Sequence, residues 1–141
     1  GKVSPLPKDP GNDAKENYYT TLKGTVKKFV DDDPEFDLPQ GLIDLYEAKD
    51  FGPYADDDGY MPVNFLTDND ITGGNSGSPV LNGNGELIGL AFDGNIEAMA
   101  GDVIFDDKLQ KTINVDIRYV LFLIDKYAGA KHIVEEMTVI K

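Results

Sequence analysis

Six consecutive residues, Gly74-Asn75-Ser76-Gly77-Ser78-Pro79, place a serine hydroxyl among the small residues that acyl transfer needs around it. A serine nucleophile must be exposed, must have a base beside it, and must lie next to backbone N–H groups that stabilise an oxyanion. Gly74 lets the backbone turn without a Cβ clash, so its N–H can point inward beside that of Ser76. Gly77 leaves room for a scissile carbonyl. We therefore predict that Ser76 is a nucleophile and that Gly74 contributes to an oxyanion hole.

An ordinary tight turn is the alternative, because Gly, Asn and Ser are the commonest turn residues. Three details favour the nucleophile: a second glycine before Asn75, the position of Pro79, and a following strand that ends in a polar, glycine-containing segment. The order strand, Gly-x-Ser-Gly-x-Pro, strand, with a glycine-rich hairpin after it, is that of chymotrypsin-like serine peptidases. The esterase motif Gly-x-Ser-x-Gly does not fit, because residue 78 is Ser.

The base is missing from this pattern. The chain contains one histidine, His132, and it follows the serine, whereas chymotrypsin-like enzymes run His, Asp, Ser along the chain. His132 also falls in a short amphipathic segment next to Lys131, so we predict a solvated or capping residue. The residues alone thus give a nucleophile loop without its base.

Composition bounds the class of protein. The 141 residues suffice for one domain with a core, and 40% of them are hydrophobic, which is typical of a globular chain. A formal net charge of −13 argues against binding to nucleic acid or anionic membranes. No cysteine is present, and the longest apolar stretch, 119–124, is far too short to span a membrane. No signal peptide is visible, although a leader could have preceded this sequence.

The Asp56-Asp57-Asp58-Gly59 run invites a calcium-site interpretation. An EF-hand loop needs a Glu at its twelfth position, and counting from Asp56 that position is Thr67. We therefore predict a solvated acidic loop, no metal site and no cofactor.

Hydrophobic periodicity and turn residues predict short antiparallel strands and a C-terminal helix. The Asn-Gly repeats at 82–85 favour a tight hairpin, and Pro39 suits the first turn of a helix that Gly52 can end. Asp116 can cap the helix that follows it. The predicted elements are an irregular lead-in at 1–16, strands at 17–30, 61–66, 78–81, 86–92 and 111–115, a loop at 54–60, and helices at 39–52, 116–128 and 130–137.

Two segments carry a resemblance to a known family. They read DITGGNSGSPVLNGNGELIGLAFDGNIEAM from Asp70 and TINVDIRYVLFLIDKYAGAKHIVEEM from Thr112. Both are similar to the C-terminal part of the bacterial dipeptidyl-peptidases seven and eleven, which are periplasmic or surface serine exopeptidases of the chymotrypsin clan. The resemblance covers residues 17–141 and is strongest over 61–140.

The resemblance implies a fold and an explanation for the missing base. The family's catalytic domain is a chymotrypsin-like double β-barrel that a helical insertion splits in sequence, with the triad His and Asp in the first piece. Residues 17–141 would be the C-terminal, nucleophile-bearing piece, with the N–H groups of Gly74 and Ser76 as the oxyanion hole. The chain alone would then be inactive, and its expected partners are peptide substrates, the absent N-terminal half of its own domain and, in the full-length form, a second copy. The expected location is the periplasm or cell surface.

The resemblance also implies substrate contacts at Phe92, Asp93 and Gly94. The residue matching Asp93 binds the free α-amino group of the substrate, a role for which a buried carboxylate is chemically suited. Phe92 would wall the subsites. Gly94 matches the position that tunes the preference for the side chain before the cut. Glycine there resembles the branch that accepts aliphatic and aromatic side chains, and arginine there marks the Asp/Glu-selective branch.

Two other functions remain open at this stage. A glutamyl endopeptidase can share the serine loop, but its selectivity normally depends on a histidine in the pocket strand, and no histidine lies between residues 76 and 131. A non-catalytic peptide-binding module on a degenerate peptidase barrel would also explain the missing base. A covalent serine probe on the full-length protein separates that module from an enzyme.

Overall fold

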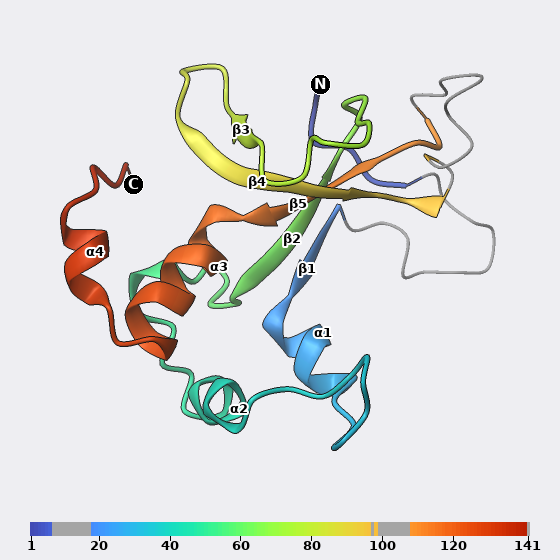
Figure 1. The fold of residues 1–141 in the computed structure, drawn as a ribbon. Coiled ribbons are helices and arrows are strands. Elements are labelled where there is room, and N and C mark those ends of the chain that lie inside the picture. The colour runs from blue at the N-terminus through green and yellow to red at the C-terminus, as the bar shows by residue number, and fades with distance from the viewer. Residues whose placement is uncertain (7–17, 97, 99–107, 141) are drawn as a thin grey trace. The chain divides into compact units, whose positions relative to one another are not determined.

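The computed structural model of the chain describes residues 1–6, 18–96, 98 and 108–140 (Figure 1). It divides into two compact units. The sheet unit comprises Gly1–Thr20 and Asn64–Ile117, and the helical unit comprises Thr21–Val63 and Arg118–Lys141.

A five-stranded sheet in the order β1-β2-β5-β4-β3 dominates the sheet unit (Figure 1). The pairs β2–β5, β5–β4 and β4–β3 are antiparallel. The strands are β1 (Tyr19–Thr21), β2 (Pro62–Thr67), β3 (Pro79–Leu81), β4 (Leu87–Gly94) and β5 (Thr112–Asp116).

One extra residue in β4 interrupts the pairing with β5. Ala91 lies opposite Asn114 and Asp93 lies opposite Ile113, so Phe92 has no partner residue in β5. Such a β-bulge bends a strand locally and is common beside functional sites. Earlier in the same strand, Gly89 allows close packing, because a Cβ there would lie 2.6 Å from the carbonyl oxygen of Val115.

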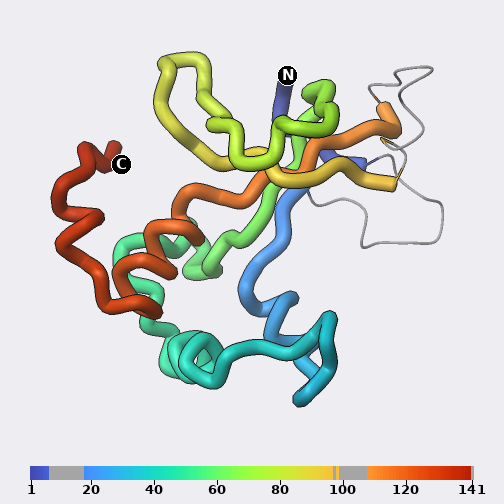
Figure 2. The backbone as a smooth tube through the Cα atoms, in the orientation of Figure 1, coloured from blue at the N-terminus to red at the C-terminus, as the bar shows by residue number. Residues whose placement is uncertain are grey.

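The first residues of the chain lie along the end of β2, as the backbone trace shows (Figure 2). Val3 bridges Thr67, the Ser4 N–H donates to the Leu66 carbonyl at 3.1 Å, and the Asp68 N–H donates to the Lys2 carbonyl at 3.0 Å. The Lys2 N–H also donates to the Asp68 carboxylate, and this bond holds the pKa of that carboxyl below its usual value.

The helical unit contains six short helical elements around an apolar core. Phe122 is fully buried, and its ring packs edge-on against Phe51 with centroids 6.1 Å apart. The elements are α1 (Leu22–Lys27), α2 (Gln40–Glu47), the 3₁₀ turn η2 (Gly52–Tyr54), α3 (Ile117–Phe122), the π-helical turn η4 (Leu123–Tyr127) and α4 (Lys131–Glu135).

Two polar contacts tie the segment around η2 to η4. The Tyr54 hydroxyl donates to Oδ2 of Asp125 at 2.9 Å, and Lys126 forms an ion pair with Asp50 at 2.7 Å. Burial and the Asp125 carboxylate together raise the pKa of Tyr54 to about 12. Both contacts join residues more than 70 positions apart in the sequence.

The predicted class, mainly antiparallel strands with helices and a C-terminal helix, is confirmed. The strand predicted over 17–30 is wrong beyond Thr21, because the chain turns there into α1 and buries Leu22 completely. The helix predicted up to Gly52 ends earlier, at Glu47, before Lys49 adopts a φ of +52°. Within the described residues, no helix is long and apolar enough to cross a membrane.

Candidate active site

The Ser76 hydroxyl is exposed on a turn whose shape depends on glycine. Gly74 and Gly77 have φ values of +95° and +85°, which L side chains rarely adopt. Ser76 Oγ donates to the Phe92 carbonyl at 3.2 Å. That carbonyl belongs to the bulged residue of β4, so the bulge supplies the acceptor that orients the hydroxyl.

A set of local hydrogen bonds fixes the turn. The Thr72 N–H donates to the Asn75 side-chain oxygen at 3.0 Å, and the Ser78 N–H donates to the Asn75 carbonyl at 2.9 Å. The Gly77 N–H donates to the Ala91 carbonyl of β4 at 2.7 Å. Among the described residues, the N–H groups of Gly74 and Ser76 donate to no protein acceptor, as an oxyanion hole requires. Their role there stays a prediction.

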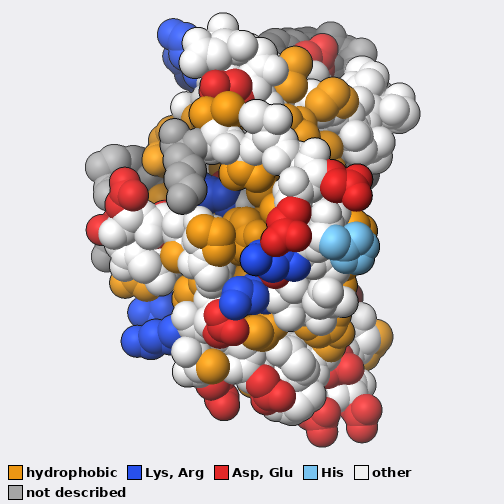
Figure 3. All heavy atoms as spheres, turned by 90° about the vertical axis from the view of Figure 1, so that its left-hand side faces the viewer, with side chains coloured by type: hydrophobic (Ala, Val, Ile, Leu, Met, Phe, Trp, Pro, Cys, Tyr) orange, Lys and Arg blue, Asp and Glu red, His pale blue; other side chains and the backbone are white. Residues whose placement is uncertain are grey.

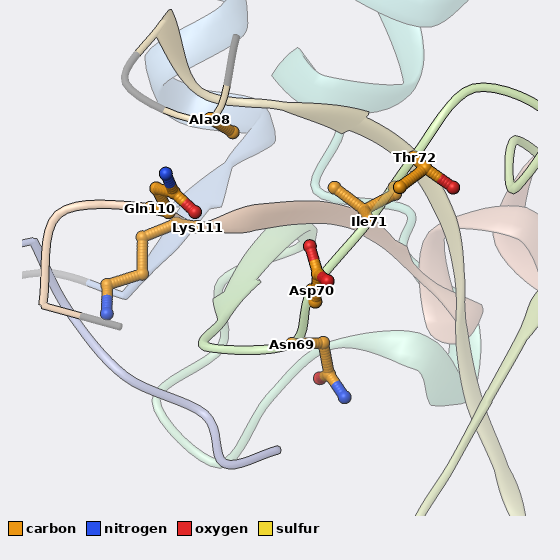
Figure 4. A pocket seen from close by; sticks show the side chains of 7 residues that line it. All are labelled: Asn69, Asp70, Ile71, Thr72, Ala98, Gln110 and Lys111. Carbon is orange, nitrogen blue, oxygen red and sulfur yellow. The ribbon is translucent and has the colours of Figure 1, made fainter. Parts of the chain in front are cut away.

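A pocket of about 240 Å³ lies within the sheet unit, and one of its lining residues, Thr72, is hydrogen-bonded to Asn75 of the serine turn. Figure 4 shows that its lining comes from three separate segments: the stretch before the serine turn, Ala98 beyond the end of β4, and the entry to β5. The lining residues are Asn69, Asp70, Ile71, Thr72, Ala98, Gln110 and Lys111.

Gly94 packs against two of the residues that line this pocket. A Cβ built on it would come within 2.9 Å of the Ala98 Cβ and 3.6 Å of Ile71 Cγ2, and both neighbours line the pocket. A side chain at this position would therefore meet occupied space. The glycine is needed because the pocket wall already occupies the place of a side chain.

Charge in the pocket is unevenly placed. Lys111 is the single cation among the seven lining residues, and its Nζ donates to Ser4 Oγ at 3.2 Å. In Figure 4 the Lys111 side chain points away from Asp70 and Ile71. The exposed Asp70 carboxylate points toward the space between these segments, so the pocket presents negative charge next to Ile71.

Phe92 and Asp93 are both exposed in this chain, with 44% of the Phe92 surface accessible. The Gly94 N–H donates to Asp93 Oδ1 at 2.8 Å. The burial expected for this carboxylate is not provided by the described residues. The bulge directs Asp93 and Ala91 to opposite faces of β4, which no alternation rule applied to the sequence would reveal.

The single histidine is exposed on α4, in the helical unit (Figure 3), as predicted. Among the described residues, no side-chain base forms a hydrogen bond with Ser76, whose Oγ has a backbone carbonyl as its partner. The Asp56 carboxylate accepts the N–H groups of Asp58 and Tyr60, which explains the acidic loop as a turn. No group of three potential metal ligands occurs in the described part of the chain.

An exposed serine lies on a glycine turn between β2 and β3 in the sheet unit. Among known families, the peptidase S46 profile matches residues 7–139. The chain belongs to the peptidase S46 family.

Individual relatives support this assignment. A dipeptidyl-peptidase 7 of Capnocytophaga gingivalis is 68% identical over 142 residues, which cover 100% of this chain and 20% of the relative. An Asp/Glu-specific dipeptidyl-peptidase of the same organism is 52% identical over 141 residues, with the same coverage. The crystal structure of Porphyromonas endodontalis DPP11 with the dipeptide Arg-Glu superposes with a TM-score of 0.90 at 43% identity, covering 96% of this chain and 19% of that one. The chain thus spans about a fifth of the length of these relatives.

Proposed function

We propose that this chain is the nucleophile-bearing part of a serine dipeptidyl-peptidase, which releases N-terminal dipeptides from oligopeptides through an acyl-enzyme. One observation carries the proposal. An exposed serine lies on a turn held by two positive-φ glycines, with its hydroxyl oriented by a bulged strand, and Thr72, which is hydrogen-bonded to this turn, lines a side-chain pocket.

The chemistry assigns a task to each group in the turn. Ser76 Oγ attacks the scissile carbonyl while a histidine from the rest of the protein takes its proton. The carbonyl oxygen becomes an oxyanion, and the N–H groups of Gly74 and Ser76 donate to it. The peptide amine leaves with that proton, and water then releases the dipeptide from the serine ester. The His and Asp must come from outside this chain, so the 141 residues alone are expected to be inactive.

Restriction to chain ends requires a group that recognises the free α-ammonium. Asp93 supports this role because its exposed carboxylate comes one residue after the carbonyl that orients Ser76. Glutamyl endopeptidase activity does not need such a group. Activity on N-acetylated substrates equal to that on free-amine substrates would favour the endopeptidase.

We further propose that the side chain before the cut is aliphatic or aromatic. Gly94 supports this preference because it adds no charge to the pocket wall. Asp70 would repel an acidic side chain, and the Lys111 ammonium is directed to Ser4. The relatives include both dipeptidyl-peptidase 7 and Asp/Glu-specific enzymes, so kcat/KM for dipeptidyl substrates ending in Leu, Phe and Asp decides the preference.

Replacement of the nucleophile tests the proposal. In the full-length protein, Ser76→Ala should lower kcat by roughly 10⁴-fold or more, because the remaining groups give only residual catalysis. The exposed Asn84→Ala in the hairpin turn is a matched surface control and should keep wild-type turnover. A fluorophosphonate probe should label the wild type and not Ser76→Ala. A wild-type protein that neither labels nor cleaves would be the non-catalytic binding module.

A further inference from the structure

Asn95, which directly follows Gly94, connects the end of β4 to the entry of β5. Its Nδ2 donates to the Leu109 carbonyl at 2.7 Å, and its Oδ1 accepts the Lys111 N–H at 2.8 Å. Its backbone N–H donates to the Lys111 carbonyl at 3.0 Å. One residue thus forms three hydrogen bonds that join the end of β4 to the residues just before β5.

These bonds hold one side of the pocket. Lys111 lines it, and Gln110 lies between the two residues that Asn95 binds. The Ala98 N–H donates to the Asn95 carbonyl at 2.9 Å, so the residue packed against Gly94 is also attached to Asn95. Two of the seven lining residues, Ala98 and Lys111, are therefore hydrogen-bonded to Asn95, and Gln110 lies between two residues to which the Asn95 side chain is bonded.

The opposite side has a separate attachment. Thr112 Oγ1 donates to the Asn69 carbonyl at 2.9 Å, which fixes the start of the 69–72 stretch against β5. The distance between the two sides is thus set where both are attached to the entry of β5, at Lys111 and Thr112. Because the Thr112 hydroxyl is bonded to the opposite side, loss of the two Asn95 side-chain bonds should change that distance and leave the serine turn in place.

We propose that Asn95 is a positioning residue that sets the width of the substrate side-chain pocket. The inference rests on the proposed dipeptidyl-peptidase function and adds a specificity determinant to its site. An amide is required because the side chain must donate to one backbone group and accept from another at once. Aspartate keeps the shape and accepts the Lys111 N–H, but above its pKa it meets the Leu109 carbonyl with an oxygen instead of a donor.

The test uses the full-length protein with Asn95→Ala, Asn95→Asp and the control Asn84→Ala. The measured quantity is kcat/KM for three dipeptidyl substrates that share the first residue and end in Ala, Leu or Phe. Loss of the hydrogen-bonded wall should lower the Leu-to-Ala and Phe-to-Ala ratios by about tenfold in Asn95→Ala, mainly through KM. Asn84→Ala should keep both ratios.

The pH dependence of the Leu-to-Ala ratio in Asn95→Asp distinguishes a positioning role from a merely structural one. A protonated carboxyl regains the donor to the Leu109 carbonyl, so the Leu-to-Ala ratio should recover as the pH falls below about 5. The ratio cancels the titration of the catalytic base, which acts on both substrates alike. Wild type and Asn95→Ala should show no such recovery. If Asn95→Ala fails to accumulate, Asn95→Asp decides by the same ratio.

The outcomes separate this inference from the proposed function. A wild-type protein without dipeptidyl turnover refutes the function, and the role of Asn95 with it. An active wild type whose Asn95 variants lose thermal stability but keep all substrate ratios retains the function and overturns the positioning role. Altered ratios in both variants, together with pH recovery in Asn95→Asp, establish it.

Discussion

The two units bury different kinds of side chain. Nine of the eleven buried hydrophobic residues among the described positions belong to the helical unit, and all six buried polar or charged residues belong to the sheet unit. The nine are Leu22, Leu42, Ile43, Phe51, Tyr54, Met61, Leu121, Phe122 and Val134. The six are Thr67, Gln110, Lys111, Thr112, Asn114 and Asp116.

This difference indicates that the helical unit contributes mainly to the stability of the chain, whereas the buried polar groups of the sheet unit fix the orientation of its side chains. Apolar burial is strong but has no direction, and it suits a unit whose described part contains none of the predicted site residues. Buried polar groups cost free energy unless they are hydrogen-bonded, yet each bond fixes an orientation. Asn114, which is 1% exposed, donates to the Phe65 carbonyl, Thr67 Oγ1 and the Thr112 carbonyl. Five of the six groups lie on β5 or at its entry, and two of them, Gln110 and Lys111, line the pocket.

The largest effect should come from the helical core. Phe122→Ala removes a fully buried ring that packs on Phe51 and Tyr119, and such truncations cost about 3–5 kcal/mol. In the full-length protein, the thermal midpoint should fall while the ratio of kcat/KM between Leu- and Ala-ending substrates is unchanged. A changed substrate ratio in the folded variant would contradict the inference that the helical core affects stability alone.

Gly94→Ala should have a smaller effect on stability than Phe122→Ala, but it should change the relative kcat/KM of the substrates. Its Cβ would lie 2.9 Å from the Ala98 Cβ, and such overpacking costs about 1–3 kcal/mol. Substrates ending in Phe should lose kcat/KM by about tenfold more than those ending in Ala. Gly24→Ala is the matched control, because a Cβ there meets nothing within 4 Å. Equal losses for both substrates would mean that Gly94 does not shape the pocket.

The smallest effect should come from Tyr54→Phe. Loss of the hydrogen bond to the Asp125 carboxylate should cost about 1.5 kcal/mol without affecting substrate ratios. Because folding raises the pKa of Tyr54 from 10.0 to about 12, the contribution of its neutral hydroxyl is complete below pH 10 and is lost as the pH rises through 12. The difference in thermal midpoint between wild type and variant should therefore shrink over that range. A constant difference would argue against this bond.

Local signals predicted the two turns that surround β3. The Asn-Gly turn marked the β3–β4 hairpin, and the glycines around Ser76 indicated the turn that the structure contains. Tyr, Thr and Val in 17–30 favour strand, but tertiary packing overrides that preference once Leu22 is buried. An isolated sequence carries no such information.

The pocket and Asn95 could not be predicted in this way. The lining residues come from 69–72, 98 and 110–111, and only the sheet pairing brings these segments together. Asn95 reads in the sequence as a turn residue after glycine, and its partners lie 14 and 16 positions further along the chain. Lys111 likewise reads as a surface residue, because its partner Ser4 is 107 positions away.

Phe92 is an extra residue in β4, and the pairing with β5 continues on both sides of it without a missing partner. The pairs Ala91–Asn114 and Asp93–Ile113 would remain in register if Phe92 were absent, and every other side chain would keep its face. What deletion would remove is the backbone carbonyl that accepts the Ser76 hydroxyl. A substitution at position 92 keeps this backbone acceptor, whereas a deletion removes it. The orientation of the Ser76 hydroxyl therefore depends on the presence of an extra residue in β4 rather than on the side chain of that residue.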